Sequence, residues 1–345
     1  NYKRNTILEF IKTQTYRSIK DFDKDDRIIN FKNGLYYLDG FEGLINKDGD
    51  TIKGIKYFQY HKSEWNPIDP YLSFIQIPVN YDPKAENLEI DQVLEDILGW
   101  DVIPLFYEWL AYLCMSSIKY GKALMLYGQT GTGKTSILNI IFQFLGTSNI
   151  SQVPLHRLSK RFQMAFTINK LANIFDDLPS KDIYYTDGFR RLCTNQELSG
   201  EQKGKAFINW LNRCKPIFSC NELPKVKKEV PNAFYNRWIL IPCFNDMEEL
   251  GKLNKSIREK KYSEWDLSGL LNKVIHYWKR LEVDQHFMGN WDNIDFVKNK
   301  NSVWCLDKTL RNFFVSRSIE SRGKMRVGKF MFLSSSNPAL SAVNN

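Results

Sequence analysis

Cysteine pairs at metal-binding spacing, long apolar runs and a secretory leader are absent from this sequence. The six cysteines form no CxxC pair and the four histidines are scattered, so neither a zinc site nor a disulfide framework is indicated. Thiols without such partners fit a reducing, intracellular compartment, so we expect a cytoplasmic protein. The longest strongly apolar stretches, such as 137–145, fall far short of the roughly 18 residues of a membrane-spanning helix, which excludes a transmembrane protein.

Basic residues outnumber acidic ones by 48 to 39 in this chain of 345 residues, giving a formal net charge of +9. The length predicts about two to three domains, and 43% hydrophobic with 25% charged residues is typical of a folded protein. Residues 296–345 carry nine basic side chains against two acidic ones, a net charge of +7. This basic region favours a polyanionic partner.

Changes in hydrophobic periodicity divide the chain into regions. A helical opening at 6–19 is followed by strand-like runs near 34–37 and 74–77. The expected regions are an α+β segment at 1–89, a helical lead-in at 90–120 that Pro104 splits into two helices, an α/β domain with a largely parallel sheet at 121–250, a helical and basic region at 251–333, and a poorly ordered polar tail at 334–345.

One segment matches the phosphate-binding motif GxxxxGK[ST] in full, between a strand-like run at 123–127 and a helix-like run at 136–145. Its residues are Gly128, Gln129, Thr130, Gly131, Thr132, Gly133, Lys134 and Thr135. Glycines let successive backbone N–H groups turn toward a phosphate at a helix N-terminus. We therefore expect ATP here, with Lys134 reaching the β- and γ-phosphates and Thr135 holding Mg²⁺.

Two carboxylates end the apolar run 171–175, and the second lies 43 residues after Lys134. At the carboxyl end of a strand, one carboxylate can hold Mg²⁺ while its neighbour polarises the attacking water. We assign Asp176 to the metal and Asp177 to the water. The reverse assignment stays open, because adjacent side chains of a strand point to opposite faces.

A third apolar run, 215–220, ends in Asn221, whose amide can hydrogen-bond both the γ-phosphate and the attacking water. Taken alone, the sequence Asn-Glu-Leu-Pro at this point is also an ordinary turn. Sixteen residues after Asn221, Arg237 opens the run 238–242. An exposed guanidinium there could reach the phosphate of a neighbouring subunit.

In this order and spacing, the P-loop, the Asp-Asp pair, the terminal Asn and the following Arg resemble the superfamily 3 helicases, most closely the primase–helicases of viruses, phages and plasmids. The likeness covers about residues 30–280. It extends to the segments 33–35 and 77–83, the lead-in helix at 107–113, the segment 158–166 and the family's B′ region at 189–205. The family often has an arginine pair before the closing strand, whereas here Asn236 precedes Arg237.

The resemblance implies a AAA+ fold for 121–250 with a helical collar before it, a ring of six subunits with ATP between them, and movement along single-stranded DNA. It implies a pore hairpin in the B′ region, which makes Lys203, Lys205 and Phe207 the candidate DNA contacts. Basic groups track phosphates, and an aromatic ring stacks on any base. Lys122 is a candidate for acting on a neighbouring subunit's phosphate.

The last region matches the family least. Its length, its basic balance and a strand-like run at 327–333 fit a small winged-helix module that binds duplex origin DNA. A basic helical tail without a fold of its own is the alternative.

An ATP-dependent replicative DNA helicase of a virus, phage, plasmid or other mobile element is the function these features predict. The alternative is an initiator that uses ATP to assemble on origin DNA without processive unwinding. A packaging motor and an RNA helicase share the same motifs. The chain begins at Asn1 rather than Met, and we expect any primase domain to lie upstream of it.

Overall fold

The computed structural model describes residues 6–7, 10, 17–18, 21–41, 44–45, 51–52, 54–60, 66–67, 71–179, 183–204, 207–224, 232–243, 245, 247, 251 and 259–288. All of them belong to the compact unit Asn1–Cys305.

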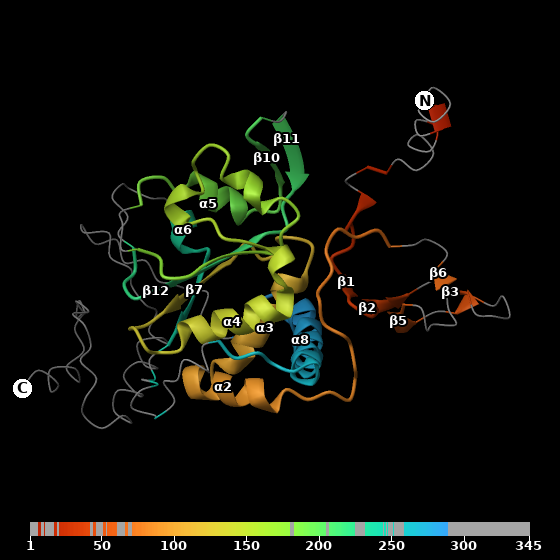
Figure 1. Cartoon of the computed structure of the whole chain (residues 1–345), viewed down its shortest axis with the longest axis horizontal. Helices are drawn as coiled ribbons and strands as arrows, with labels where there is room; N and C mark the ends of the chain where they lie inside the picture. Colours follow the sequence, from red (N-terminus) through yellow and green to blue (C-terminus); the bar gives the residue numbers. More distant parts are fainter. Residues whose placement is uncertain are drawn as a thin grey trace, which may run out of the picture. The chain divides into compact units, whose positions relative to one another are not determined.

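A five-stranded, wholly parallel sheet forms the centre of the α/β region (Figure 1). Its strands in spatial order are β13 (Trp238–Pro242), β7 (Ala123–Tyr127), β12 (Lys215–Cys220), β9 (Ala172–Phe175) and β8 (Ile150–Ser151). Every residue of β7, β12 and β13 is buried. Strands covered on both faces read as continuous apolar runs, which is why the sequence pattern located them.

The expected α/β domain with a parallel sheet is confirmed, and the runs at 123–127 and 238–242 are strands with those bounds. The strand β8 was not expected, because two residues are too short for a periodicity signal. β12 lies between β7 and β9, so the strand before the P-loop and the strand before the two aspartates are not neighbours. The carboxyl end of β12 is therefore held between the P-loop and the aspartates.

Helices occupy the connections and the flanks of this sheet. They are α2 (Leu88–Leu98), α3 (Ile103–Cys114), α4 (Lys134–Leu145), α5 (Asp187–Leu192), α6 (Asn232–Tyr235) and α8 (Glu264–Asp284), with short 3₁₀ turns at Thr147–Asn149, Leu155–Arg157 and Met164–Thr167. Pro104 sits in the first turn of α3, where its missing N–H is not needed, and it separates α2 from α3 as expected. No single helix in the described part of the chain is long and apolar enough to cross a membrane.

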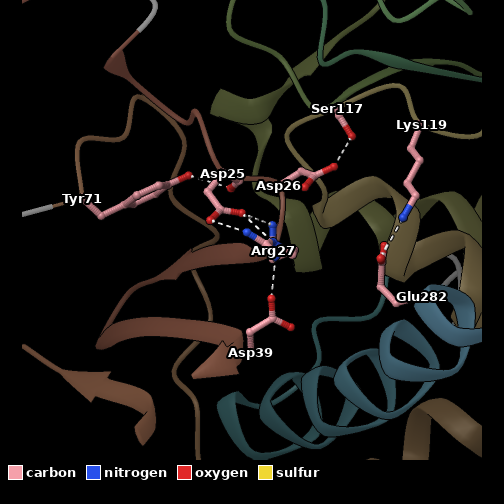
Figure 2. Close-up of polar contacts among 8 residues, drawn as sticks. All are labelled: Asp25, Asp26, Arg27, Asp39, Tyr71, Ser117, Lys119 and Glu282. Atoms are coloured by element: carbon pink, nitrogen blue, oxygen red, sulfur yellow. Dashed lines mark hydrogen bonds and ion pairs between the residues drawn. The ribbon is translucent and has the colours of Figure 1, made fainter. Parts of the chain in front are cut away.

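The long helix α8 lies alongside α3 (Figure 1). Glu108 of α3 is fully buried and forms an ion pair with Arg280 of α8. A buried carboxylate requires such a partner, because desolvation of an unpaired charge is costly. Beyond the end of α3, Lys119 pairs with Glu282 at 2.7 Å (Figure 2). The expected helix at 267–281 is thus confirmed and begins three residues earlier, where the Ser263 hydroxyl caps it.

Antiparallel strands make up the N-terminal region. One sheet has the order β1 (Ile28–Phe31), β2 (Gly34–Phe41) and β5 (Ile55–Gln59), and a smaller one joins β4 (Thr51–Ile52), β3 (Leu44–Ile45) and β6 (Asn66–Pro67). The expected strand near 34–37 is the start of β2.

The expectation of a strand at 74–77 was wrong. Only Ile77 forms a bridge, to Phe31, and no other residue of 74–77 belongs to a strand. Side chains satisfy the neighbouring carbonyls instead: Asn30 donates to the Ile75 oxygen at 3.0 Å and Asn149 to the Gln76 oxygen at 2.8 Å. These bonds replace the ladder of a sheet and keep the segment irregular.

The charged residues 25–27, just before β1, form ion pairs and a hydrogen bond that hold this segment in place (Figure 2). Arg27 bridges Asp25 and Asp39, with distances of 3.2 Å and 2.6 Å from guanidinium to carboxylate. The Ser117 hydroxyl, in the loop after α3, donates to Asp26 at 2.6 Å. The N-terminal region is therefore bonded to the loop that leads into β7.

The expected winged-helix module at 251–333, apart from 251 and 259–288, and the expected tail at 334–345 lie outside the described residues. The same holds for most of the helical opening at 6–19.

Candidate nucleotide-binding site

The P-loop joins the buried end of β7 to the first turn of α4. Two of its glycines are required by their surroundings. A Cβ at Gly128 would lie 2.0 Å from the Cys243 carbonyl oxygen. Gly133 has a φ of +84° and packs against Ile97, so a side chain there would meet both backbone strain and a clash. The loop can therefore expose its N–H groups only with glycine at these positions.

Lys134 points back into the loop that precedes it. Its ammonium donates to the carbonyl oxygens of Gly128 and Gln129, both at 2.7 Å, and the residue is 8% exposed. Burial lowers the pKa of Lys134, and the nearby Asp176 and Asp177 carboxylates oppose that shift. A cation held inside a loop of backbone N–H groups is the arrangement that fits a polyphosphate.

Thr135 and Asp176, the two residues expected to hold Mg²⁺, are brought together by the fold. The Thr135 hydroxyl donates to Asp176 Oδ2 at 2.9 Å. Thr135 is the second residue of α4, whereas Asp176 follows β9 on the far side of β12. A hydroxyl and a carboxylate oxygen at this separation are hard oxygen ligands of the kind that Mg²⁺ prefers.

Ser219 is a residue of the site that sequence reasoning missed. It is fully buried in β12, and its hydroxyl donates to Asp176 Oδ1 and accepts the Asp177 N–H at 2.8 Å. The available signal was a polar residue inside the apolar run 215–220. Ser219 thus orients Asp176 from the neighbouring strand, while the other carboxylate oxygen faces Thr135.

Asp177 departs from the strand geometry that sequence reasoning assumed. Its φ of +53° places the backbone in the left-handed region, and its side chain is exposed. The Asp177 N–H donates to Asp176 Oδ1 at 2.9 Å as well as to Ser219. Aspartate tolerates this conformation better than most residues. The turn presents Asp177 to solvent beside a fixed Asp176.

Asn221, at the end of β12, contacts the P-loop directly. Its Nδ2 donates to the Thr130 hydroxyl at 3.3 Å, and one residue earlier the Cys220 carbonyl accepts the Gly128 N–H at 3.2 Å. The structure therefore brings the P-loop, Asp176 and Asn221 together at the carboxyl ends of β7, β9 and β12.

Arg237 and Lys122 lie at the opposite end of the sheet. The Ala123 N–H, at the start of β7, donates to the Arg237 carbonyl at 2.7 Å, so Arg237 precedes β13 at its amino end. Lys122 donates to the Asn236 carbonyl at 2.9 Å. The five residues of β7 separate both from the P-loop by about 16 Å at about 3.3 Å per residue. Neither is placed to reach a nucleotide on its own chain's P-loop, and action on a neighbouring subunit stays a prediction.

The Arg237 guanidinium is half-buried rather than exposed. One of its N–H groups donates to the Ala233 carbonyl at α6. The Arg237 side chain is therefore folded against its own subunit. To reach a neighbouring subunit, it must break the hydrogen bond to the Ala233 carbonyl and extend into solvent.

The candidate DNA contacts lie on a separate two-stranded hairpin, β10 (Glu197–Glu201) and β11 (Phe207–Leu211). Trp210 is 1% exposed and anchors the hairpin, whereas Phe207 is 63% exposed. Lys203 is exposed in the turn, and Lys205 lies outside the described residues. A hairpin therefore exists where the B′ region was expected.

Comparison with known families finds one match, over part of the chain. The profile described as "Family of unknown function (DUF5906)" matches residues 126–237. That segment runs from the end of β7 to Arg237 and is about a third of the 345 residues. No curated protein sequence matches the chain.

Among solved structures, the chain is similar to the C-terminal region of NrS-1. The A form apo structure has 18% sequence identity and a TM-score of 0.48, with coverage of 66% of this chain and 52% of that chain. An A form apo structure of residues 305–718 of NrS-1 has 20% identity and a TM-score of 0.45, with coverage of 61% and 48%. The chain therefore spans about half the length of the solved chains it matches.

Proposed function

We propose that this chain is the ATP-hydrolysing motor of a DNA helicase that moves along single-stranded DNA. The observation that carries the proposal is the meeting of Thr135, Asp176 and Ser219 next to a buried Lys134. A P-loop lysine, a threonine and a carboxylate fixed by a second-strand hydroxyl are the parts that phosphoryl transfer from ATP requires.

The residues present fit Mg²⁺ and ATP. The loop at 128–133 cannot accept a Cβ at Gly128, which keeps its backbone open to phosphate oxygens. Lys134 would exchange its carbonyl partners for phosphate oxygens, and Thr135 and Asp176 would hold the metal. When bound, Mg²⁺ neutralises charge on the β- and γ-phosphates.

Asp177 and Asn221 are proposed to act on the attacking water. Asp177 is exposed beside Asp176, and its backbone is fixed by two hydrogen bonds, so its carboxylate can accept a proton from water without moving the metal ligand. Asn221 already contacts Thr130 of the P-loop, and its amide can orient both that water and the γ-phosphate.

The position of Arg237 and Lys122 supports a proposal about subunit assembly. Because both lie at the end of the sheet away from the P-loop, we propose that they contact the nucleotide of an adjacent subunit in a homo-oligomeric ring, as the superfamily 3 resemblance implies. Lys203, Lys205 and Phe207 are proposed to contact the strand in its centre.

Unwinding of a forked DNA by the wild type and by Asp177→Asn tests the proposal. Asparagine also tolerates a positive φ, so the variant should fold and bind ATP but neither hydrolyse it nor unwind. Asp101→Asn, the same change at an exposed position before α3, is the control and should behave as wild type. Normal turnover by Asp177→Asn would refute the water-activating role. Hydrolysis by the wild type without unwinding would favour the initiator alternative.

A further inference from the structure

A cleft away from the P-loop lies between the β10–β11 hairpin and the segment that follows β8. Its volume is about 460 Å³, within the range of about 300–1,000 Å³ found for ligand sites. Residues from three stretches of the chain line it: His156, 158–162 and Met164; Tyr185, 187–188 and Arg191; and 199–201 with Phe207. Figure 1 shows the hairpin next to α5, which contributes the second stretch.

Positive charge predominates in the cleft. Lys160, Arg161 and Arg191 line it, against the carboxylates of Asp187 and Glu201. Asp187 is paired with Arg190 on the same helix, which adds a further cation beside the cleft. A phosphodiester would therefore meet a surplus of basic groups.

The cleft also carries aromatic surface. Tyr185 is 67% exposed and Phe207 is 63% exposed, although aromatic side chains are usually buried. Phe162 has a φ of +67°, a left-handed conformation that a bulky residue rarely adopts, and the Arg161 guanidinium lies 4.8 Å from its ring centroid. Backbone strain of this kind concentrates at binding sites.

One ion pair spans the cleft. Arg161 donates twice to Glu201 Oε2, from Nε at 2.9 Å and from an Nη at 2.7 Å. The pair joins the segment after β8 to the turn end of the hairpin, where Glu201 is opposite Phe207. Its side chains are 73% and 35% exposed, and exposed ion pairs are weak, so another anion can replace Glu201 at little cost.

We propose that this cleft binds one segment of a single-stranded nucleic acid and that Glu201 controls access to it. A backbone phosphate displaces the Glu201 carboxylate from Arg161 and is also contacted by Lys160. The base beside that phosphate stacks on Phe207 or Tyr185. Binding thereby frees the hairpin from the segment after β8. This inference rests on the proposed function and names the part of the surface that holds the strand.

Oligonucleotide binding by the full chain tests the inference, measured by fluorescence anisotropy of a labelled oligo(dT) over a range of salt concentrations. Arg161→Gln should weaken binding about tenfold and lower the slope of log K against log salt by about 0.7, because one phosphate contact is lost. Glu201→Gln should tighten binding by about fivefold with the slope unchanged, because the competing carboxylate is gone.

Two matched variants control for net charge. Arg157→Gln removes an exposed arginine from the neighbouring 3₁₀ turn, and Glu197→Gln removes a glutamate from the same hairpin strand, and neither residue lines the cleft. Each should change the affinity by less than twofold.

The double variant Arg161→Gln with Glu201→Gln separates competition from general electrostatics. If Glu201 acts through Arg161, the gain from Glu201→Gln disappears in this background. If Glu201→Gln tightens binding equally in the Arg161→Gln background, the inference is overturned. It is also overturned if the wild type binds oligo(dT) and both single variants bind it with unchanged affinity. Failure of the wild type to bind oligo(dT) at all would instead overturn the proposed function, and with it this inference.

Discussion

Lys215 is a fully buried lysine at the start of β12, and it makes the stability of the protein depend on pH. Its ammonium donates to the Met115 carbonyl and lies 5.2 Å from the centroid of the Tyr112 ring. Burial lowers the pKa of Lys215 from 10.5 to about 7, and the nearby thiols of Cys114 and Cys214 oppose the shift. No carboxylate among the described residues forms an ion pair with it.

The sign of the effect follows from the two pKa values. Between pH 7 and pH 8.5 the unfolded chain keeps the Lys215 proton while the native chain releases it, so the free energy of unfolding rises with pH. The slope approaches about 1.4 kcal/mol per pH unit, and integration over this interval amounts to about 1.5 kcal/mol. Part of this rise is offset within the same interval, because burial raises the pKa of Cys114 and Cys214 to about 12, whereas the unfolded thiols, with an ordinary pKa of about 8.5, begin to ionise.

Urea unfolding at pH 7.0, 7.5, 8.0 and 8.5 with a thiol reductant measures this contribution. Lys215→Met keeps the length of the side chain and removes the titrating group, so its stability should rise by about 1.5 kcal/mol less than that of wild type. Lys273→Met, at an exposed position on α8, controls for the loss of one positive charge. Parallel curves for wild type and Lys215→Met would refute the reasoning and indicate that Lys215 stays charged in the native state.

Three further outcomes are expected. Gly128→Ala should lower the free energy of unfolding by about 1–3 kcal/mol, because its Cβ would overlap the Cys243 oxygen; thermal melting checks this, and an unchanged midpoint would contradict it. Asp177→Ala should be less stable than Asp177→Asn by about 1 kcal/mol in urea titrations, since alanine lacks the left-handed tolerance of asparagine, whereas equal stabilities would argue against the turn. Arg237→Ala and Lys134→Ala should each lack ATP hydrolysis, but mixing them should restore part of it in a coupled phosphate-release assay; absence of rescue would argue for a site within one subunit.

Much of the candidate nucleotide site could be predicted from the sequence because its parts are local. A P-loop needs glycines, a lysine and a hydroxyl within eight consecutive residues, and the strands around it are buried on both faces, so they appear as apolar runs that end in polar side chains. Asp176 and Asn221 follow such runs directly. Their approach to the P-loop follows once the strands are parallel and share a sheet.

Contacts between distant segments were not predictable in the same way. β12 forms backbone hydrogen bonds with both β7 and β9. The hydrophobic pattern of a strand indicates that it is buried, but it does not indicate which strands lie beside it. Ser219 was missed for this reason, since its role exists only when β12 lies beside Asp176. The segment 74–77 was taken for a strand because its apolar alternation does not reveal that side-chain amides would bond its carbonyls.

By itself, the sequence determined the P-loop, which is the basis of the proposed nucleotide site, and the α/β character of the domain that holds it. Only the tertiary structure decided that Arg237 and Lys122 lie at the end of the sheet away from the P-loop. It also decided that Arg161 and Glu201, which are 40 residues apart in the chain, form an ion pair across a cleft. The physical reason is the range of each interaction: backbone conformation and burial are encoded within a few residues, whereas ion pairs and strand neighbours form between segments that only folding brings together.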